Sequence, residues 1–145
     1  MLRQFLVGGA VSVCNITIHA FVMTAVARVA QRTSSKNIAH PSLLLACVMI
    51  ATVLVLMVAH TCEVAVWALA YLLVNAVAAD SGLLYFAFVN YTTLGYGDVL
   101  PKPDWLLLGP MTAMNGLLLF GWSTAVIFQV LSRAMARTAG DMAHD

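Results

Sequence analysis

The sequence predicts an all-α membrane protein, and three observations lead to that fold class. Of the 145 residues, 62% are hydrophobic and only 9% are charged, whereas soluble domains carry about 25% charged residues. Residues 42–79 carry only Glu63, and three further stretches carry no charge at all, namely residues 5–27, 81–97 and 105–132. A helix crosses a bilayer with roughly 20 apolar residues. The apolar runs are continuous rather than alternating, which argues against a β-barrel.

The same composition excludes several classes of protein. A water-soluble enzyme and a disordered chain are ruled out because the chain has too little polar surface. The net charge of +1 supplies no patch for a nucleic acid. Three cysteines lie in apolar runs without a CxxC spacing, so they predict neither a disulfide framework nor a thiolate metal site. No catalytic constellation is present, and we expect neither an enzyme nor an organic cofactor.

Residues 1–29 are predicted to form an N-terminal transmembrane helix whose apolar run covers residues 5–27. That run is longer than the roughly 7–15-residue core of a signal peptide, so we expect the helix to be retained. Residues 30–41 follow as a loop that holds Arg32 and Lys36 and no acidic residue. Basic residues in a short loop mark the cytoplasmic side of a membrane, so the N-terminus is expected outside.

Residues 42–79 form one long apolar region with two interpretations. A straight helix of this length would extend roughly 57 Å, against a hydrocarbon core of about 30 Å. In the first interpretation an outer transmembrane helix covers residues 42–60 and bends into an extension, residues 61–79, along the outer interface. In the second, the region is one tilted and kinked helix. Polar and aromatic side chains at every fourth position favour the first interpretation; they are Glu63, Trp67, Tyr71 and Asn75.

A short helix is predicted over residues 82–92, where Asp80 and Ser81 are good N-caps. Its three turns or so are too few to cross a bilayer, so it is expected to be re-entrant. A loop at residues 99–104, which holds two prolines, then leads to the last span at residues 105–132.

The motif that indicates a function lies at residues 93–98 and reads Thr-Leu-Gly-Tyr-Gly-Asp. It follows an aromatic-rich helix, precedes a proline by three residues and stands between two hydrophobic spans. In this setting it resembles the selectivity filter of potassium channels. The resemblance covers residues 42–131, and the chain is similar to small bacterial ion channels that have a two-helix pore module and one extra N-terminal transmembrane helix. It implies a pore domain at residues 42–136 and a short cytoplasmic tail at residues 137–145.

The resemblance implies how the filter binds potassium ions. Successive carbonyl groups point to one side of the chain only when left-handed and right-handed backbone conformations alternate, and Gly95 and Gly97 tolerate positive φ. Tyr96 is expected to point away from the pore into an aromatic cuff. The ion-binding carbonyls implied are those of Thr93, Leu94, Gly95 and Tyr96.

Asp98, at the end of the filter, lacks one partner that the resemblance leads us to expect. Many bacterial relatives place a glutamate in the pore helix, where it holds the filter aspartate. The corresponding residue here is Val89. We therefore expect Asp98 to bind Tyr85, Trp105 or water instead.

One filter strand supplies only a quarter of the family's oxygen cage, so the resemblance implies a homotetramer with cyclic fourfold symmetry. We expect it to be a multi-pass protein in the lipid bilayer of the inner (plasma) membrane, with its filter facing outside. No span carries Arg or Lys at every third position, so we expect no voltage sensor. Two alternatives stay open: a cation channel that also passes sodium, and a non-conducting membrane sensor or assembly subunit that uses His60 and Glu63.

The last span carries polar and small residues in a helical pattern. Polar groups in a span face the bundle interior or a water-filled path, so Thr112 and Asn115 are assigned to the cavity below the filter. The alternative for both is hydrogen bonding between helices. Gly116 and Gly121 are the two candidates for a gating hinge. A stripe of small residues at heptad spacing is suited to close helix packing and consists of Gly109, Gly116 and Ser123.

Three ionisable residues in the predicted spans have no assigned partner: His19, His60 and Glu63. Ionisable groups inside a membrane are costly and mark function by default. His60 and Glu63 are three residues apart on one helix, so they lie on one face. Three interpretations stay open: a hydrogen-bonded anchor, a pH sensor based on histidine, and a metal site that needs His19 as a further ligand.

Overall fold

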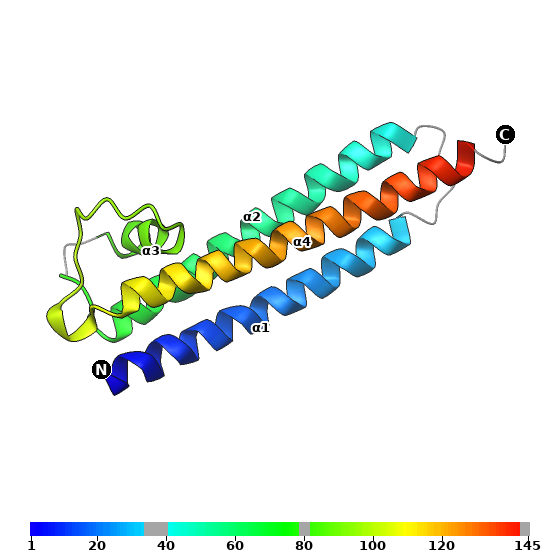
Figure 1. The fold of residues 1–145 in the computed structure, drawn as a ribbon. Coiled ribbons are helices and arrows are strands. Elements are labelled where there is room, and N and C mark those ends of the chain that lie inside the picture. Colours follow the sequence, from blue (N-terminus) through cyan, green and yellow to red (C-terminus); the bar gives the residue numbers. More distant parts are fainter. Residues whose placement is uncertain (34–40, 79–81, 143–145) are drawn as a thin grey trace.

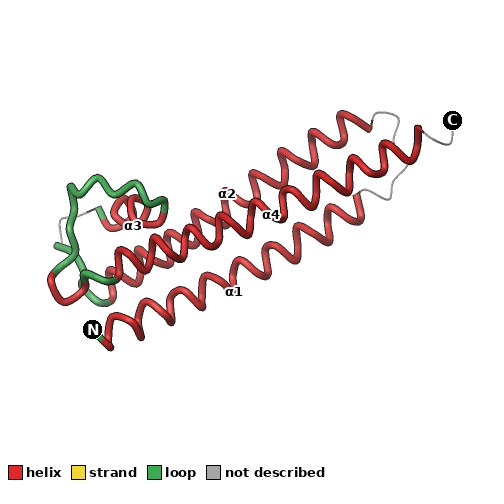
Figure 2. Tube along the Cα trace, in the orientation of Figure 1, coloured by secondary structure: helices red, strands yellow, loops and turns green. Residues whose placement is uncertain are grey.

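The computed structural model describes residues 1–33, 41–78 and 82–142. Three long helices lie side by side, and a short helix packs at one end of them (Figure 1). The N-terminus lies at the same end as the short helix, whereas the last described residues of the chain lie at the opposite end. The loops that join the short helix to its neighbours gather at that first end as well (Figure 2). The described elements are α1 (Leu2–Thr33), α2 (Pro41–Leu73), α3 (Leu83–Tyr91), a 3-10 turn (Pro103–Trp105) and α4 (Leu108–Met142).

The three long helices are each apolar and long enough to cross a membrane. The qualifying segments are Leu2–Val29, Leu43–Leu73 and Pro103–Arg133, with mean hydropathies of 1.8, 2.7 and 1.5. Helix α3 has 9 residues and is far shorter than the roughly 20 residues that a span requires. The predicted class, an all-helical membrane protein with a short pore-type helix, is confirmed.

Helix α2 corrects the prediction of a bend at His60. It runs without a break through 33 residues, so the separate interfacial helix over residues 61–79 is wrong and a single long helix is present. The physical reason is the environment of the polar face. Trp67 and Tyr71 are fully buried against α3 and α4, whereas an interfacial helix would expose them to lipid headgroups. A helix of this length is roughly 50 Å long, which a bilayer accommodates by tilt.

The end of α2 is joined to the segment that precedes α4. Asn75 adopts a positive φ of 54°, and asparagine is one of the few residues that enter this conformation readily. Its side-chain oxygen accepts a hydrogen bond from Lys102 Nζ at 2.9 Å. The backbone N–H of Lys102 also donates to the carbonyl of Ala76 at 2.7 Å. These two bonds fix the loop that precedes α4 to the end of α2.

Two other boundaries differ from the predictions. Gly82 is the N-cap of α3 and makes no side-chain capping bond, while Asp80 and Ser81 lie outside the described residues. The last long helix begins at Leu108, after the 3-10 turn, because Pro103 favours the start of a tight turn over helix interior. It continues to Met142, so the predicted tail at residues 137–145 is helical up to that residue.

Two buried clusters hold the helices together. The larger lies under the short helix and joins α2, α3 and the start of α4 through aromatic rings; its large members are Trp67, Tyr71, Phe86, Tyr91, Trp105 and Leu108. The smaller lies toward the opposite end and consists of Met23, Val26, Leu56, Val126 and Val130. The larger cluster therefore supports α3, and with it the segment at residues 93–98.

Candidate functional site

The backbone of residues 93–98 alternates in handedness. Thr93, Gly95 and Gly97 have φ values of +61°, +59° and +76°. Among the other described residues only Asn75 has a positive φ, so Leu94 and Tyr96 do not share this conformation. This alternation is the one that turns successive carbonyl groups to the same side of a strand. Glycine explains it at two positions, whereas no local pattern indicated that Thr93 would adopt a strained conformation.

The end of α3 holds the start of this strand. The carbonyl of Val89 accepts hydrogen bonds from the backbone N–H groups of Leu94 at 2.9 Å and Gly95 at 3.4 Å, and the carbonyl of Asn90 accepts one from Thr93 at 3.0 Å. The last carbonyl groups of a helix lack partners within the helix. These bonds therefore satisfy carbonyl groups at the end of α3 and N–H groups of the segment that follows it. Val89 thus supports residues 93–98 through its backbone.

Asp98 binds one of the three partners that were considered for it, Tyr85. The hydroxyl of Tyr85 donates to Asp98 Oδ2 at 2.8 Å. The same hydrogen bond to a carboxylate raises the pKa of Tyr85 above its ordinary value. Trp105, the other ring considered, is buried and instead contacts the guanidinium of Arg3, which lies 4.3 Å from the ring centroid. Tyr85 on α3 therefore binds the carboxylate of Asp98, which is the interaction that the resemblance assigned to a glutamate.

All six residues at positions 93–98 are exposed in the single chain. Tyr96 is 68% exposed, so the aromatic cuff that was expected around its ring is not formed by its own chain. These residues belong to the loop that follows α3, at one end of the long helices (Figure 2). Residues 93–98, the tyrosine among them, are therefore not enclosed by the chain itself.

Thr112 and Asn115 do not line a cavity, which corrects their assignment. They are 0% and 2% exposed. The hydroxyl of Thr112 pairs with that of Tyr71, and Asn115 Oδ1 accepts from Trp67 Nε1 at 3.0 Å. Asn15 Nδ2 on α1 donates to the same oxygen at 3.2 Å. These polar groups face other helices because a buried donor or acceptor without a partner is costly in an apolar interior.

The small residues of α4 allow the helix to approach α3 closely. A Cβ added to Gly116 would lie 2.1 Å from the carbonyl oxygen of Tyr91, and one added to Gly109 would lie 2.8 Å from Asn90 Oδ1. A Cβ on Gly121 would meet nothing within 4 Å. Close packing is therefore the structural requirement at Gly116, whereas Gly121 lies on an open surface.

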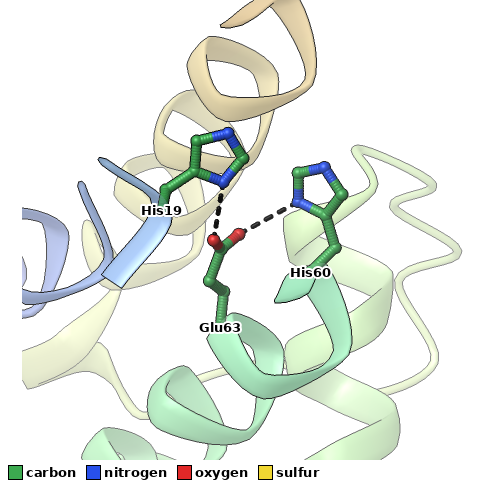
Figure 3. A group of neighbouring side chains, drawn as sticks. All are labelled: His19, His60 and Glu63. Carbon is green, nitrogen blue, oxygen red and sulfur yellow. Dashed lines mark hydrogen bonds and ion pairs between the residues drawn. The ribbon is translucent and has the colours of Figure 1, made fainter. Parts of the chain in front are cut away.

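The three ionisable residues of the predicted spans meet in one buried cluster. Figure 3 shows the carboxylate of Glu63 between two imidazole rings. His19 Nδ1 on α1 lies 2.8 Å from Glu63 Oε1, and His60 Nδ1 lies 3.0 Å from Glu63 Oε2. Tyr91 of α3 donates its hydroxyl hydrogen to Glu63 Oε2. Tyr91 was not foreseen as a partner, because residues 28 positions apart share no helical face.

The geometry of this cluster is that of hydrogen bonds. Two histidines and a glutamate form a donor set that zinc uses in other proteins, and one nitrogen or oxygen atom from each lies within 4.8 Å of the others. Each Nδ1 atom, however, is directed at its own carboxylate oxygen (Figure 3). A divalent ion with a single carboxylate would also leave a net positive charge in the membrane interior, where charge is costly.

Comparison with known proteins places this arrangement in a family. The family model described as "Ion channel" matches residues 44–133, which is more than half of the chain. No curated protein and no solved structure matches the chain. The matched stretch contains nearly all of α2, all of α3, the loop with residues 93–98 and α4 as far as Arg133, and it leaves α1 outside. The chain is therefore a multi-pass membrane protein, not an enzyme, and it belongs to the ion channel family.

Proposed function

We propose that the protein is a potassium-selective channel that conducts K⁺ passively through a homotetrameric pore without a voltage sensor. The observation that carries this proposal is the alternating backbone at Thr93, Gly95 and Gly97, which lies in a Thr-Leu-Gly-Tyr-Gly-Asp motif. Rings of backbone carbonyls replace the hydration shell of a potassium ion in filters of this kind. The oxygens proposed here as ligands are the carbonyls of Thr93, Leu94, Gly95 and Tyr96.

A fourfold assembly is proposed because one chain leaves the site incomplete. Its six filter residues are exposed, and a single strand cannot surround an ion. Irregular backbone at membrane depth needs either protein around it or a water-filled cavity beside it. Three further copies around a fourfold axis supply both, and they enclose the ring of Tyr96 as well.

The arrangement of the termini supports the proposed orientation. The N-terminus and the filter lie at one end of the bundle, and the C-terminal end of α4 lies at the other (Figure 1). Arg133 near that second end is exposed, and basic residues favour the cytoplasmic side. We therefore place the filter outside the plasma membrane. In this organisation residues 1–29 form an accessory helix and residues 42–136 form the pore domain.

Ion flux in proteoliposomes tests the proposal. The purified protein is expected to release K⁺ and to exclude Na⁺. Gly95→Ala is expected to abolish the flux, because an alanine is strained at a φ of +59°. Gly9→Ala is a matched control, since a Cβ at Gly9 meets nothing within 4 Å. Equal flux of both ions would indicate a non-selective cation channel, and no flux from a verified tetramer would favour a non-conducting sensor.

A further inference from the structure

Four side chains from three helices form a closed ring of hydrogen-bond contacts. Glu63 and Ser123 lie on opposite sides of the ring, and each of the two imidazoles, those of His19 and His60, bridges them. Ser123 Oγ lies 3.0 Å from His60 Nε2 and 3.3 Å from His19 Nε2. The Nδ1 atoms of the same two rings contact the carboxylate at 2.8 and 3.0 Å. The ring thereby links α1, α2 and α4.

The hydrogens available in the ring determine its protonation. Four contacts need four hydrogens. Two neutral imidazoles supply one each and Ser123 supplies one, while an ionised Glu63 supplies none. Tyr91 adds no hydrogen to the ring, because its own hydrogen is directed at Glu63 from outside while its hydroxyl oxygen lies 3.0 Å from His60 Nδ1. One contact therefore lacks a hydrogen unless the ring holds one additional proton.

The same proton also neutralises the ring. Glu63 and His19 are completely buried, and an unpaired charge in such a place is costly. An ionised glutamate with one protonated and one neutral imidazole has a net charge of zero. A divalent metal in the same place would leave a net charge of +1 if Tyr91 kept its proton. Hydrogen bonding and charge thus favour the same occupant, a single proton.

Among the residues that the structure describes, the side chains in contact with the ring from α3 and α4 are uncharged. Helix α3 contributes the hydroxyl of Tyr91, and α4 contributes uncharged groups, among them the rings of Phe120 and Trp122. The apolar runs of α1 and α4, residues 5–27 and 105–132, carry no Asp, Glu, Lys or Arg. The side chain of His60 is 14% exposed, which gives the buried proton one edge through which to exchange.

We propose that His19, His60, Glu63 and Ser123 form a binding site for one proton, and that this proton fastens α1 to the pore module. Only His19 comes from α1, which lies outside the matched region. The same carboxylate accepts the Tyr91 hydroxyl, at the end of the helix that holds the filter strand. Loss of the proton leaves one contact without a hydrogen and a buried net negative charge, so α1 and the pore helix lose a shared anchor. The effect on conduction rests on the proposed channel function, whereas the proton site does not.

Tryptophan fluorescence of the purified full-length protein tests the site directly. The rings of His19 and Trp122 lie 5.3 Å apart, and a protonated imidazole quenches a neighbouring indole. Emission is expected to rise with pH along a one-proton curve, and Trp122→Phe identifies the share of the signal that comes from this ring. His19→Gln and His60→Gln are expected to abolish the transition. His40→Gln is the matched control and is expected to retain it.

Further variants keep the test valid if a histidine variant does not fold. Ser123→Ala keeps both imidazoles and the carboxylate, and it is expected to shift the midpoint because the ring is opened. A transition that persists in both histidine variants, or a midpoint unchanged in Ser123→Ala, would overturn the proposal. A signal that follows added zinc and is reversed by a chelator would overturn it in favour of a metal site.

Measurements of potassium flux distinguish the proposed channel function from the proposed proton site. Potassium flux is expected to change by roughly tenfold with the same midpoint as the fluorescence, and to become independent of pH in His60→Gln. A one-proton fluorescence transition in a protein without any flux would support the proton site and contradict the channel function. A fluorescence transition accompanied by a potassium flux that does not depend on pH would overturn the anchoring role of the proton.

Discussion

Gly116 of α4 lies directly against Tyr91 of α3, so closely that a Cβ on the glycine would stand 2.1 Å from the tyrosine's carbonyl oxygen. The obstacle is backbone, which cannot rotate away as a side chain can. The approach brings α4 against the end of α3, directly before residues 93–98. A single glycine therefore determines how near α4 can come to the end of α3.

Gly116→Ala is expected to destabilise the protein. The added methyl group forces α4 and α3 apart, and overpacking of this kind costs about 1–3 kcal/mol. The free energy of unfolding in mixed micelles measures the effect. Gly121→Ala is the control, because its Cβ meets nothing within 4 Å and alanine favours a helix. If both variants unfolded alike, close packing would not be the role of Gly116.

Tyr85→Phe is expected to weaken the outer end of the filter. It removes the 2.8 Å hydrogen bond to Asp98 and leaves the ring in place. Because this pair is exposed, we expect little change in global unfolding and instead a faster decay of potassium flux after opening. Asp98→Asn and the double variant complete a thermodynamic cycle. Effects that simply add would show that the two residues do not act through their hydrogen bond.

Tyr91→Phe is expected to destabilise the bundle more than Tyr85→Phe does. It removes a buried hydroxyl that donates to Glu63, and hydrogen bonds to charged groups contribute about 1.5–3 kcal/mol. The fully buried ring of Tyr91 stays packed, so the measured difference reports the hydroxyl. Unfolding of the two phenylalanine variants in the same micelles makes the comparison. Equal stability of the two would show that the buried Tyr91 hydroxyl contributes no more than the exposed hydroxyl of Tyr85.

Gln4→Ala is expected to loosen the start of α1 from the start of α4. Gln4 is 8% exposed, and its Oε1 accepts a hydrogen bond from the backbone N–H of Leu107 at 2.8 Å. Without this acceptor the N–H of Leu107 loses its partner, which lowers the free energy of unfolding by about 1 kcal/mol. Limited proteolysis of the N-terminus and the free energy of unfolding both measure the change. Gln129→Ala, at an exposed position of α4, serves as control and should leave both unchanged.

Local properties of the chain were predictable from its sequence. The long apolar runs predict three spanning helices because a bilayer selects for apolar length. The glycines at positions 95 and 97 predict positive φ because they lack a Cβ, and the structure has that conformation at both. For Asp98 the sequence narrowed the candidate partners to Tyr85, Trp105 and water, and the structure selects Tyr85, which lies 13 positions away on the adjoining short helix.

Only the tertiary structure decided which way the polar faces point. A helical repeat shows that side chains share a face, but not which neighbour covers it. From the sequence, Thr112 and Asn115 could either line a cavity or form hydrogen bonds with another helix. The structure shows that their partners are Tyr71 and Trp67. The continuity of α2 and the ring around Glu63 depend likewise on contacts between residues as far apart as His19 and Ser123. Such contacts arise when whole helices pack, and no local preference of the chain encodes them.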